Sequence, residues 1–246
     1  MNNAKIDLLK KYIDESDNIV FFGGAGVSTE SNIPDFRSSD GLFNKNLNKH
    51  FSPEQLVSHS FYLHHPKDFF KFYKENMVYE NAKPNKAHLA LAKLEKEGKL
   101  RAIVTQNIDG LHQAAGSKNV YELHGSIHSN TCENCKEKFN LKEFLALKGD
   151  IPTCPICGSR VKPDVVLYEE SLDEDTIVQS IKAISEADML IVGGTSLVVY
   201  PAAGFLDYFH GKHLVLINKT STAMDKKADL VINDSIASVL SKAVDL

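Results

Sequence analysis

The sequence predicts an α/β protein: a parallel sheet with helices on both faces, and a smaller module beside the sheet. Short apolar runs of strand length recur along the chain, and segments whose apolar residues have helical spacing separate several of them. All four cysteines fall in one block, which indicates the smaller module. The composition, with 24% charged residues and a net charge of −4, is that of a globular protein without the clustered basic face typical of nucleic-acid binding.

Six apolar runs are expected to form the strands of the sheet. They are residues 19–22, 102–104, 189–192 and 214–217, with weaker runs at 120–123 and 230–232. Runs that are apolar throughout are typical of strands buried on both faces. Such sheets bind ligands at the carboxyl ends of their strands, so the residues that follow each run are the first candidates for a site.

Three segments are expected to be the helices that cover this sheet. Near the N-terminus, Ile6, Leu9 and Ile13 fit one helix face. Residues 84–100 show the same spacing. A third helix is expected to begin after Asp173, whose carboxylate suits an N-cap.

A polar, charged N-terminal stretch and the lack of any apolar run near the roughly 20 residues of a membrane span predict a cytoplasmic protein with no membrane partner. The four cysteines are then expected to be reduced.

A glycine-rich stretch, FFGGAGVSTE, follows the first run. Gly24, Ala25 and Gly26 are similar to the start of a dinucleotide-binding turn, in which glycines admit a pyrophosphate and a helix N-terminus faces it. Ser28 and Thr29 would add hydroxyl donors or cap that helix. The third glycine of the usual fingerprint and its later acidic residue are missing, so an ordinary strand-to-helix turn is an equal alternative.

The stretch IPDFR comes next. Pro34 biases Ile33 towards extended geometry, so Asp35, Phe36 and Arg37 are expected on a loop. Arg37 is one of only three arginines in the chain. It is interpreted either as a phosphate ligand or as a surface charge, and Phe36 either as a cover over a reactive ring or as a buried anchor.

Polar side chains follow two of the predicted strands. Gln106, Asn107 and Asp109 come directly after the run 102–104, and His124 ends the run 120–123. Because parallel strands open at one edge of a sheet, we expect these residues to line a cleft. Turn capping is the alternative for Asn107 and Asp109, and a satisfied histidine at a strand end is the alternative for His124.

The cysteines form two Cys-x₂-Cys pairs separated by eighteen residues: Cys132 with Cys135, and Cys154 with Cys157. This spacing is typical of a structural zinc site, in which four thiolates leave no open position for water. Two disulfides or a redox pair are the alternatives, and the expected reducing compartment disfavours disulfides.

In chain order, the motifs GAGVS, PDFR, QNIDGLH, LHG, the two cysteine pairs, GTSL and VYPA resemble those of the sirtuins, a family of NAD-dependent protein lysine deacylases. The resemblance spans residues 19–218 and is greatest to the compact bacterial members. It implies one catalytic domain, residues 1–246, and favours a monomer. A Rossmann-like part would comprise 1–38, 83–128 and 161–246. The small module would join a helical insertion, 39–82, to a zinc ribbon, 129–160.

The resemblance also implies an NAD site in the cleft between these parts. The residues implied at the phosphates and the reactive ribose are Gly24, Ala25, Ser28, Thr29, Phe36 and Arg37. Those implied around the nicotinamide and its ribose are Ile33, Asp35, Gln106, Asn107, Ile108 and Asp109. On the adenosine side they are Thr195, Ser196, Asn218 and Ile236.

The implied reaction is deacetylation. The acyl-lysine oxygen would attack the ribose carbon as nicotinamide leaves, with His124 as general base and Asn107 as the second catalytic residue. The products would be lysine, nicotinamide and O-acetyl-ADP-ribose. An acetyl-lysine peptide would add as a strand beside the segment RVKPDVVLYEE, with Val165 and Val199 lining the lysine tunnel. The alternatives are an ADP-ribosyltransferase and a non-enzymatic NAD-sensing protein.

One departure from the family lies in the peptide segment. The Phe-Gly-Glu usual there is replaced by Tyr168, Glu169 and Glu170. The lost glycine changes the backbone freedom of the loop, and the added charge predicts a preference for basic residues beside the acetyl-lysine.

Overall fold

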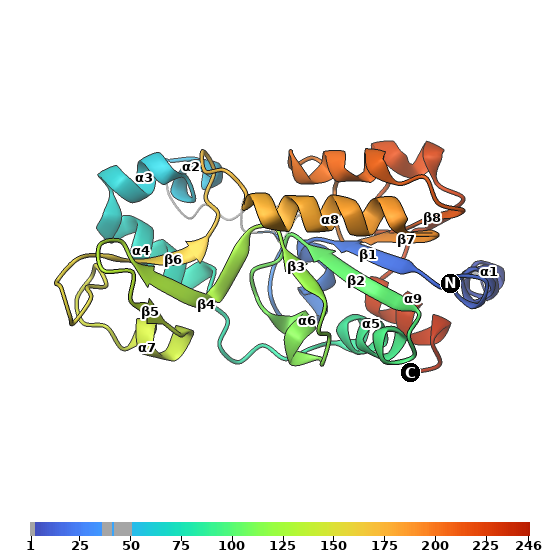
Figure 1. Cartoon of the computed structure of the whole chain (residues 1–246), viewed down its shortest axis with the longest axis horizontal. Coiled ribbons are helices and arrows are strands. Elements are labelled where there is room, and N and C mark those ends of the chain that lie inside the picture. The colour runs from blue at the N-terminus through green and yellow to red at the C-terminus, as the bar shows by residue number, and fades with distance from the viewer. Residues whose placement is uncertain (1–2, 36–40, 42–50) are drawn as a thin grey trace.

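The computed structural model describes residues 3–35, 41 and 51–246. Two parts lie next to each other along the long axis of the molecule (Figure 1). The larger part carries the main sheet, and the smaller holds a second sheet with helices beside it.

The main sheet has six strands, all parallel, in the order β3-β2-β1-β7-β8-β9. The strands are β1 (Ile19–Gly23), β2 (Leu100–Thr105), β3 (Val120–Glu122), β7 (Met189–Gly193), β8 (His213–Ile217) and β9 (Leu230–Ile232). All six predicted runs are confirmed as strands. The chain order reverses between β1 and β7, and this is the point at which open parallel sheets form their ligand crevice.

Helices cover both faces of the main sheet, as expected (Figure 1). Ile19 and Phe21 of β1 pack on the side of α1 (Asn3–Asp14), α5 (Lys86–Lys96) and α9 (Ile236–Ala243). Val20 and Phe22 pack on the other side, with α8 (Glu174–Glu186) and the 3₁₀ helix η4 (Ala202–Tyr208). Asp173 caps α8 as predicted, since its side chain accepts a hydrogen bond from the Thr176 N–H. The short α6 (Leu111–Ala114) and η5 (Ala223–Lys227) join other strands.

The small module combines helices with a three-stranded sheet of order β5-β4-β6. Its elements are α2 (Pro53–Leu56), α3 (His59–His64), α4 (Pro66–Asn76), β4 (Gly125–Cys132), β5 (Lys138–Phe139), α7 (Leu141–Leu145) and β6 (Val161–Val165). The antiparallel sheet takes in residues 125–128 and 161–165, which the sequence assigns to the Rossmann-like part. Alternate residues of β6 are buried, a pattern of one covered face that a search for continuous apolar runs does not detect. The exact division of the domain stays a prediction.

The glycine-rich turn does not lead into an α-helix. It is followed by two single 3₁₀ turns, η1 (Ala25–Val27) and η2 (Thr29–Ser31), which end at Asn32 in the left-handed region with a φ of 63°. The expected α-helix N-terminus behind this turn is therefore wrong. Pro34 explains part of the difference, because the residue before a proline avoids helical geometry.

In the described part of the chain, no helix combines the length and the apolar character needed to cross a membrane.

Candidate active site

Two glycine turns meet where the order of the main sheet reverses. The N–H of Gly26 donates to the carbonyl of Gly194 at 2.8 Å, which joins the turn after β1 to the turn after β7. A Cβ atom on Gly26 would lie 2.8 Å from the Gly194 Cα. Gly194 has a φ of 61°, so both turns need glycine for their approach.

A row of polar groups continues from this junction along the ends of neighbouring strands. The Gln106 amide donates to Thr195 Oγ1 at 3.1 Å, and the Thr195 N–H donates to Asn218 Oδ1 at 3.0 Å. The Asn218 Nδ2 is buried and has no hydrogen-bond partner within the described chain. An unpaired buried donor is costly, so it is a natural contact for a ligand.

A second group of side chains lies beside the 3₁₀ turns. Asn107 is only 8% exposed, and its Nδ2 donates to Ser28 Oγ at 3.1 Å. The Ser28 hydroxyl donates to Asp109 Oδ2 at 2.6 Å, and Asp109 Oδ1 accepts from the Leu111 N–H at 2.9 Å. The structure thus brings together three predicted site residues from segments about 80 positions apart.

His124 lies between β3 and β4, and its protonation is defined by one contact. Its Nδ1 is 2.9 Å from the carbonyl oxygen of Gln106. A carbonyl can only accept, so Nδ1 must carry the hydrogen, and in the neutral ring Nε2 is then the basic nitrogen. Burial lowers the pKa of His124, against a smaller opposing effect of the Gln106 hydrogen bond. The ring is therefore neutral near pH 7, with its basic nitrogen on the side away from Gln106.

The remaining predicted residues on the glycine side belong to the 3₁₀ turns and the segment that follows them. Ala25 lies in η1, and the Thr29 hydroxyl donates to the carbonyl of Gly26 at 3.1 Å. Ile33 and Asp35 are half-buried. Phe36 and Arg37 lie outside the described residues.

Five other predicted residues are spread around this centre. Ile108 packs against the small-module core, and Val165 is buried within it. Ser196 is exposed and Val199 half-buried in the loop after β7. Ile236 is 5% exposed and fills the core under Gly193, where an added Cβ would lie only 2.1 Å from its Cδ1.

Three residues that help to hold the site were not identified from the sequence. Asn85 Nδ2 donates to the Val27 carbonyl at 2.7 Å and to Ser31 Oγ at 3.0 Å. His128 Nε2 donates to the carbonyl of Asp109 at 3.0 Å, and Gly194 forms the junction described above. Asn85 had a weak signal, as a cap residue before a helix. Gly194 opens the GTSL motif but was not named as a site residue, and His128 had no signal. The contacts of both depend on how the strands are ordered.

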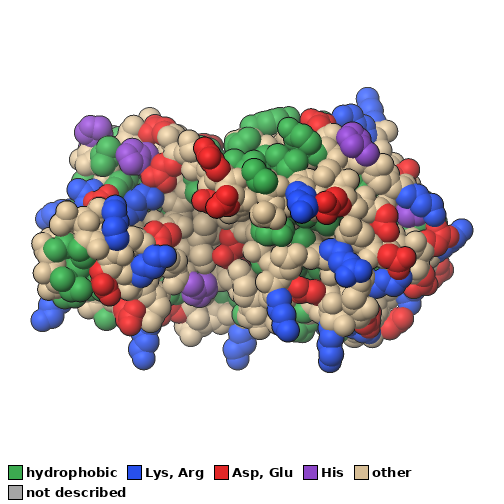
Figure 2. Space-filling view, in the orientation of Figure 1, with side chains coloured by type: hydrophobic (Ala, Val, Ile, Leu, Met, Phe, Trp, Pro, Cys, Tyr) green, Lys and Arg blue, Asp and Glu red, His purple; other side chains and the backbone are tan. Residues whose placement is uncertain are grey.

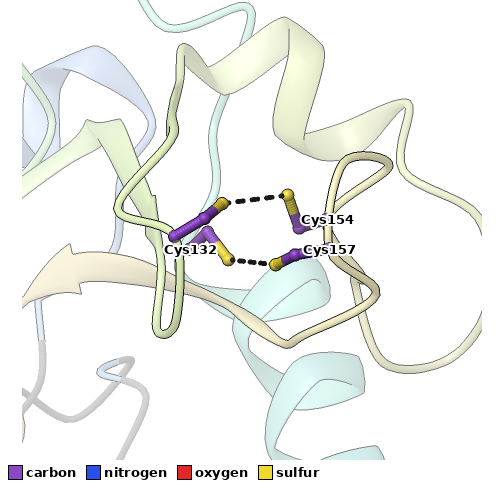
Figure 3. A group of neighbouring side chains, drawn as sticks. Cys132, Cys154 and Cys157 are labelled. Atoms are coloured by element: carbon purple, nitrogen blue, oxygen red, sulfur yellow. Dashed lines mark hydrogen bonds between the residues drawn. The ribbon is translucent and has the colours of Figure 1, made fainter.

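The four cysteines converge beside the end of β4 in the small module (Figure 3). All four Sγ atoms lie within 4.8 Å of one another, with Cys132 to Cys157 at 3.4 Å and Cys135 to Cys154 at 3.6 Å. These separations exceed the roughly 2.05 Å of a disulfide. They suit a tetrahedral zinc, whose Zn–S bonds of about 2.3 Å place sulfurs about 3.8 Å apart.

Comparisons with known proteins agree with this arrangement. The model of the Sir2 family matches residues 24–201. A Clostridium perfringens protein named NAD-dependent protein deacetylase is 65% identical over 98% of this chain and 99% of its own length. A Sir2 structure with a deacetylated peptide and 3′-O-acetyl ADP ribose has a TM-score of 0.90 at 36% identity, covering 98% of this chain and 97% of that one. A Sir2–peptide–NAD⁺ structure has a TM-score of 0.85, with the same identity and coverage. The chain therefore belongs to the Sir2 family, as its motifs predicted.

Proposed function

We propose that this protein is an NAD-dependent protein lysine deacetylase. It transfers the acetyl group of acetyl-lysine to ADP-ribose and releases nicotinamide and free lysine. The observation that carries the proposal is the state of His124: a buried, neutral imidazole whose Nδ1–H is held by the Gln106 carbonyl, leaving Nε2 as a base. The name of the Clostridium relative, and the acetyl-ADP-ribose and NAD⁺ in the Sir2 structures, support the same reaction.

The residues present fit NAD as the co-substrate. The unpaired Asn218 Nδ2 offers a donor at the strand ends, beside the row formed by Gln106 and Thr195. We propose that Thr195 and Asn218 hold the adenosine side and that Gln106, at the other end of the row, holds the nicotinamide ribose. The junction of Gly26 with Gly194 would let the backbone approach the phosphates. NAD supplies the ribose carbon that receives the acetyl oxygen.

Asp109 and Asn107 would orient the nicotinamide side. The Ser28 hydroxyl and the Leu111 N–H hold both oxygens of Asp109, and Asn107 is fixed through the same hydroxyl. Side chains that are fixed before the ligand binds reduce the cost of ordering it. In this arrangement His124 would take a proton from a ribose hydroxyl.

The zinc ion would be structural. Four thiolates complete its coordination. Cys132 ends β4, whereas His124 directly precedes the first residue of that strand, Gly125. The role of the zinc is to fold the ribbon that carries β4 and β6.

The test is to incubate the protein with NAD and an acetyl-lysine peptide and to detect O-acetyl-ADP-ribose by mass spectrometry. His124→Ala should lower the rate at least about 100-fold, a typical loss for a general base. Its zinc content and thermal unfolding should match those of the wild type. Nicotinamide release without peptide deacetylation would instead indicate an ADP-ribosyltransferase, and NAD binding without turnover would indicate a sensor.

We further propose that the protein works as a monomer in the cytoplasm, without nucleic acid or membrane. Four free thiol ligands suit a reducing compartment. Sedimentation of the zinc-loaded protein would test the monomer, and fractionation of cells would test the location.

A further inference from the structure

The loop after β6 contains a residue with a strained backbone. Glu169 has a φ of 75°, in the left-handed region that side-chain residues rarely occupy. Glycine would adopt this conformation without strain. A glutamate held there indicates that its side chain contributes something that offsets the backbone cost.

The carboxylate of Glu169 is exposed at the surface, and it makes a contact within the chain. Its Oε2 accepts hydrogen bonds from the Ser60 N–H at 2.8 Å and from the Ser60 hydroxyl at 2.6 Å. These two hydrogen bonds lower the pKa of Glu169. Ser60 lies in the first turn of α3, so the contact joins the β6 loop to the helical insertion.

Backbone contacts run alongside this side-chain contact. The Tyr168 N–H donates to the Val57 carbonyl at 3.0 Å, and the His59 N–H donates to the Tyr168 carbonyl at 2.9 Å. Together they form a short parallel bridge between Ser58 and Tyr168.

Glu170 secures the same loop from a different side. Its carboxylate lies 2.8 Å from His59 Nδ1 and 3.1 Å from Lys162 Nζ, and it accepts from the Leu167 N–H at 2.9 Å. Glu170 thus pairs with His59 and Lys162, and the carboxylate of Glu169 is available to bind Ser60.

The loop also contacts the backbone of His124, the proposed general base. The Val166 N–H donates to the carbonyl of His124 at 2.9 Å. A shift of the loop relative to α3 would thus move one wall of the site in which acetyl-lysine meets His124. In Figure 2 the surface dips between the small module and the large part, on the side where α3 and the start of α8 lie in Figure 1.

We infer that Glu169 is a positioning residue: its carboxylate latches the β6 loop to α3 and so fixes the edge on which the acetyl-lysine peptide binds. This inference rests on the proposed deacetylase function. It differs from the expectation that Glu169 selects peptides by its charge, because here the carboxylate serves an internal contact.

Three variants separate the latch from backbone strain and from charge. Glu169→Gln keeps an oxygen that can accept from Ser60 and removes the charge. Glu169→Ala removes the latch and keeps the strained backbone. Glu169→Gly removes the latch and relieves the strain.

The kinetic test measures KM for an acetyl-lysine peptide, kcat, and KM for NAD. We expect Glu169→Ala and Glu169→Gly to raise the peptide KM about fivefold, the effect of losing one or two ordinary hydrogen bonds. Glu169→Gln should stay within about twofold of the wild type. The kcat at saturating peptide and the KM for NAD should change little in all three.

Hydrogen exchange tests the latch without relying on activity. The amides of His59, Ser60 and Tyr168 should exchange faster in Glu169→Ala and Glu169→Gly, while those of β1 and β7 stay protected. Exchange like that of the wild type at these three amides would overturn the latch. The peptide KM could instead rise as much in Glu169→Gln as in Glu169→Ala, and only for peptides with flanking lysines. That result would refute the latch and show that Glu169 selects peptides by its charge. An inactive wild-type protein would refute the proposed function, and the exchange data would still decide the latch.

Discussion

The two parts of the molecule are stabilised in different ways. In the large part, β1, β7 and β8 are buried at every position, and apolar clusters lie on both faces of the sheet. The second sheet has only three strands, and β5 has two residues. Its core is rich in aromatic side chains, and two of the four clustered cysteines, Cys132 and Cys154, are buried in it. The large part can rely on burial alone, whereas the small module has four cysteines that could bind a structural zinc and so close its ribbon.

The site depends on both parts. The Ile127 N–H of β4 donates to the Ile108 carbonyl at 3.0 Å, next to Asp109. The Val166 N–H, which follows β6, donates to the carbonyl of His124 at 2.9 Å. The large part supplies the strand ends, and the small module holds two of the segments that carry the proposed catalytic groups. Stability and activity should therefore separate when only one part is disturbed.

Loss of zinc should have the largest effect. Zinc binding in small peptides contributes on the order of 10–16 kcal/mol of folding free energy. Cys154→Ser, which removes a buried ligand, should therefore unfold the small module and abolish deacetylation. Zinc content, activity and hydrogen exchange measured on the same sample would check this.

The exchange pattern is the decisive part of that experiment. Protection should be lost in β4, β6 and α7 and kept in β1, β7 and α5. If both parts lose protection together, the molecule is one cooperative unit and the contrast drawn here is wrong. An exposed residue of the same small sheet, Lys138 of β5, provides the control position for a mild substitution, Lys138→Ala.

Mild acid should destabilise the large part, because the buried histidines His88 and His112 belong to it. His88 and His112 lie 4.8 Å apart between ring centroids, and His112 packs against Phe21 of β1. Burial lowers the pKa of His88 to about 4 and that of His112 to about 3. At a pH between these lowered pKa values and the ordinary 6.5, the two histidines are protonated in the unfolded chain but not in the folded chain. The free energy of unfolding therefore falls as the pH falls below 6.5.

The loss should amount to a few kcal/mol, since each unit of pKa difference is worth about 1.4 kcal/mol. The variant His112→Leu isolates it, because neither ring nitrogen of His112 has a hydrogen-bond partner within the described chain. Urea unfolding from pH 7.5 to 5 should show a flatter decline in the variant. Equal slopes in both proteins would mean that His112 does not contribute to acid sensitivity, and comparing the two at each pH cancels the acid sensitivity of the zinc site itself.

The same contrast explains what the sequence could predict. Buried parallel strands are continuous apolar runs, so all six strands of the main sheet could be located. The small sheet could not, because β4 contains Ser126, His128 and Asn130 and is therefore not a continuous apolar run. The spacing of the cysteines predicted the candidate metal site, because the two cysteines of each Cys-x₂-Cys pair are close together in the sequence.

Within the site, residue types could be predicted and contacts could not. Gln106, Asn107 and His124 were chosen as candidates because ligands bind at the carboxyl ends of parallel strands, and their roles stay predictions. That Ser28 bridges Asn107 and Asp109, and that Glu169 reaches Ser60, depends on the packing of segments far apart in the chain. The presence of Glu169 in this loop was visible in the sequence. The sequence alone does not distinguish a carboxylate that acts by its charge on a peptide from one that latches two segments of the chain.

The smallest expected effect comes from a surface ion pair in the small module. Lys67 of α4 lies 3.4 Å from Asp150, which follows α7, and both side chains are more than 70% exposed. Such a pair contributes about 0–1 kcal/mol, because water and salt screen it. Lys67→Ala should therefore change the free energy of unfolding by less than about 0.5 kcal/mol. Phe144→Ala, in the fully buried core of the same module, should cost about 3–5 kcal/mol. If Lys67→Ala destabilised the module as much as Phe144→Ala, its helices and zinc ribbon would be joined by charge rather than by their shared aromatic core.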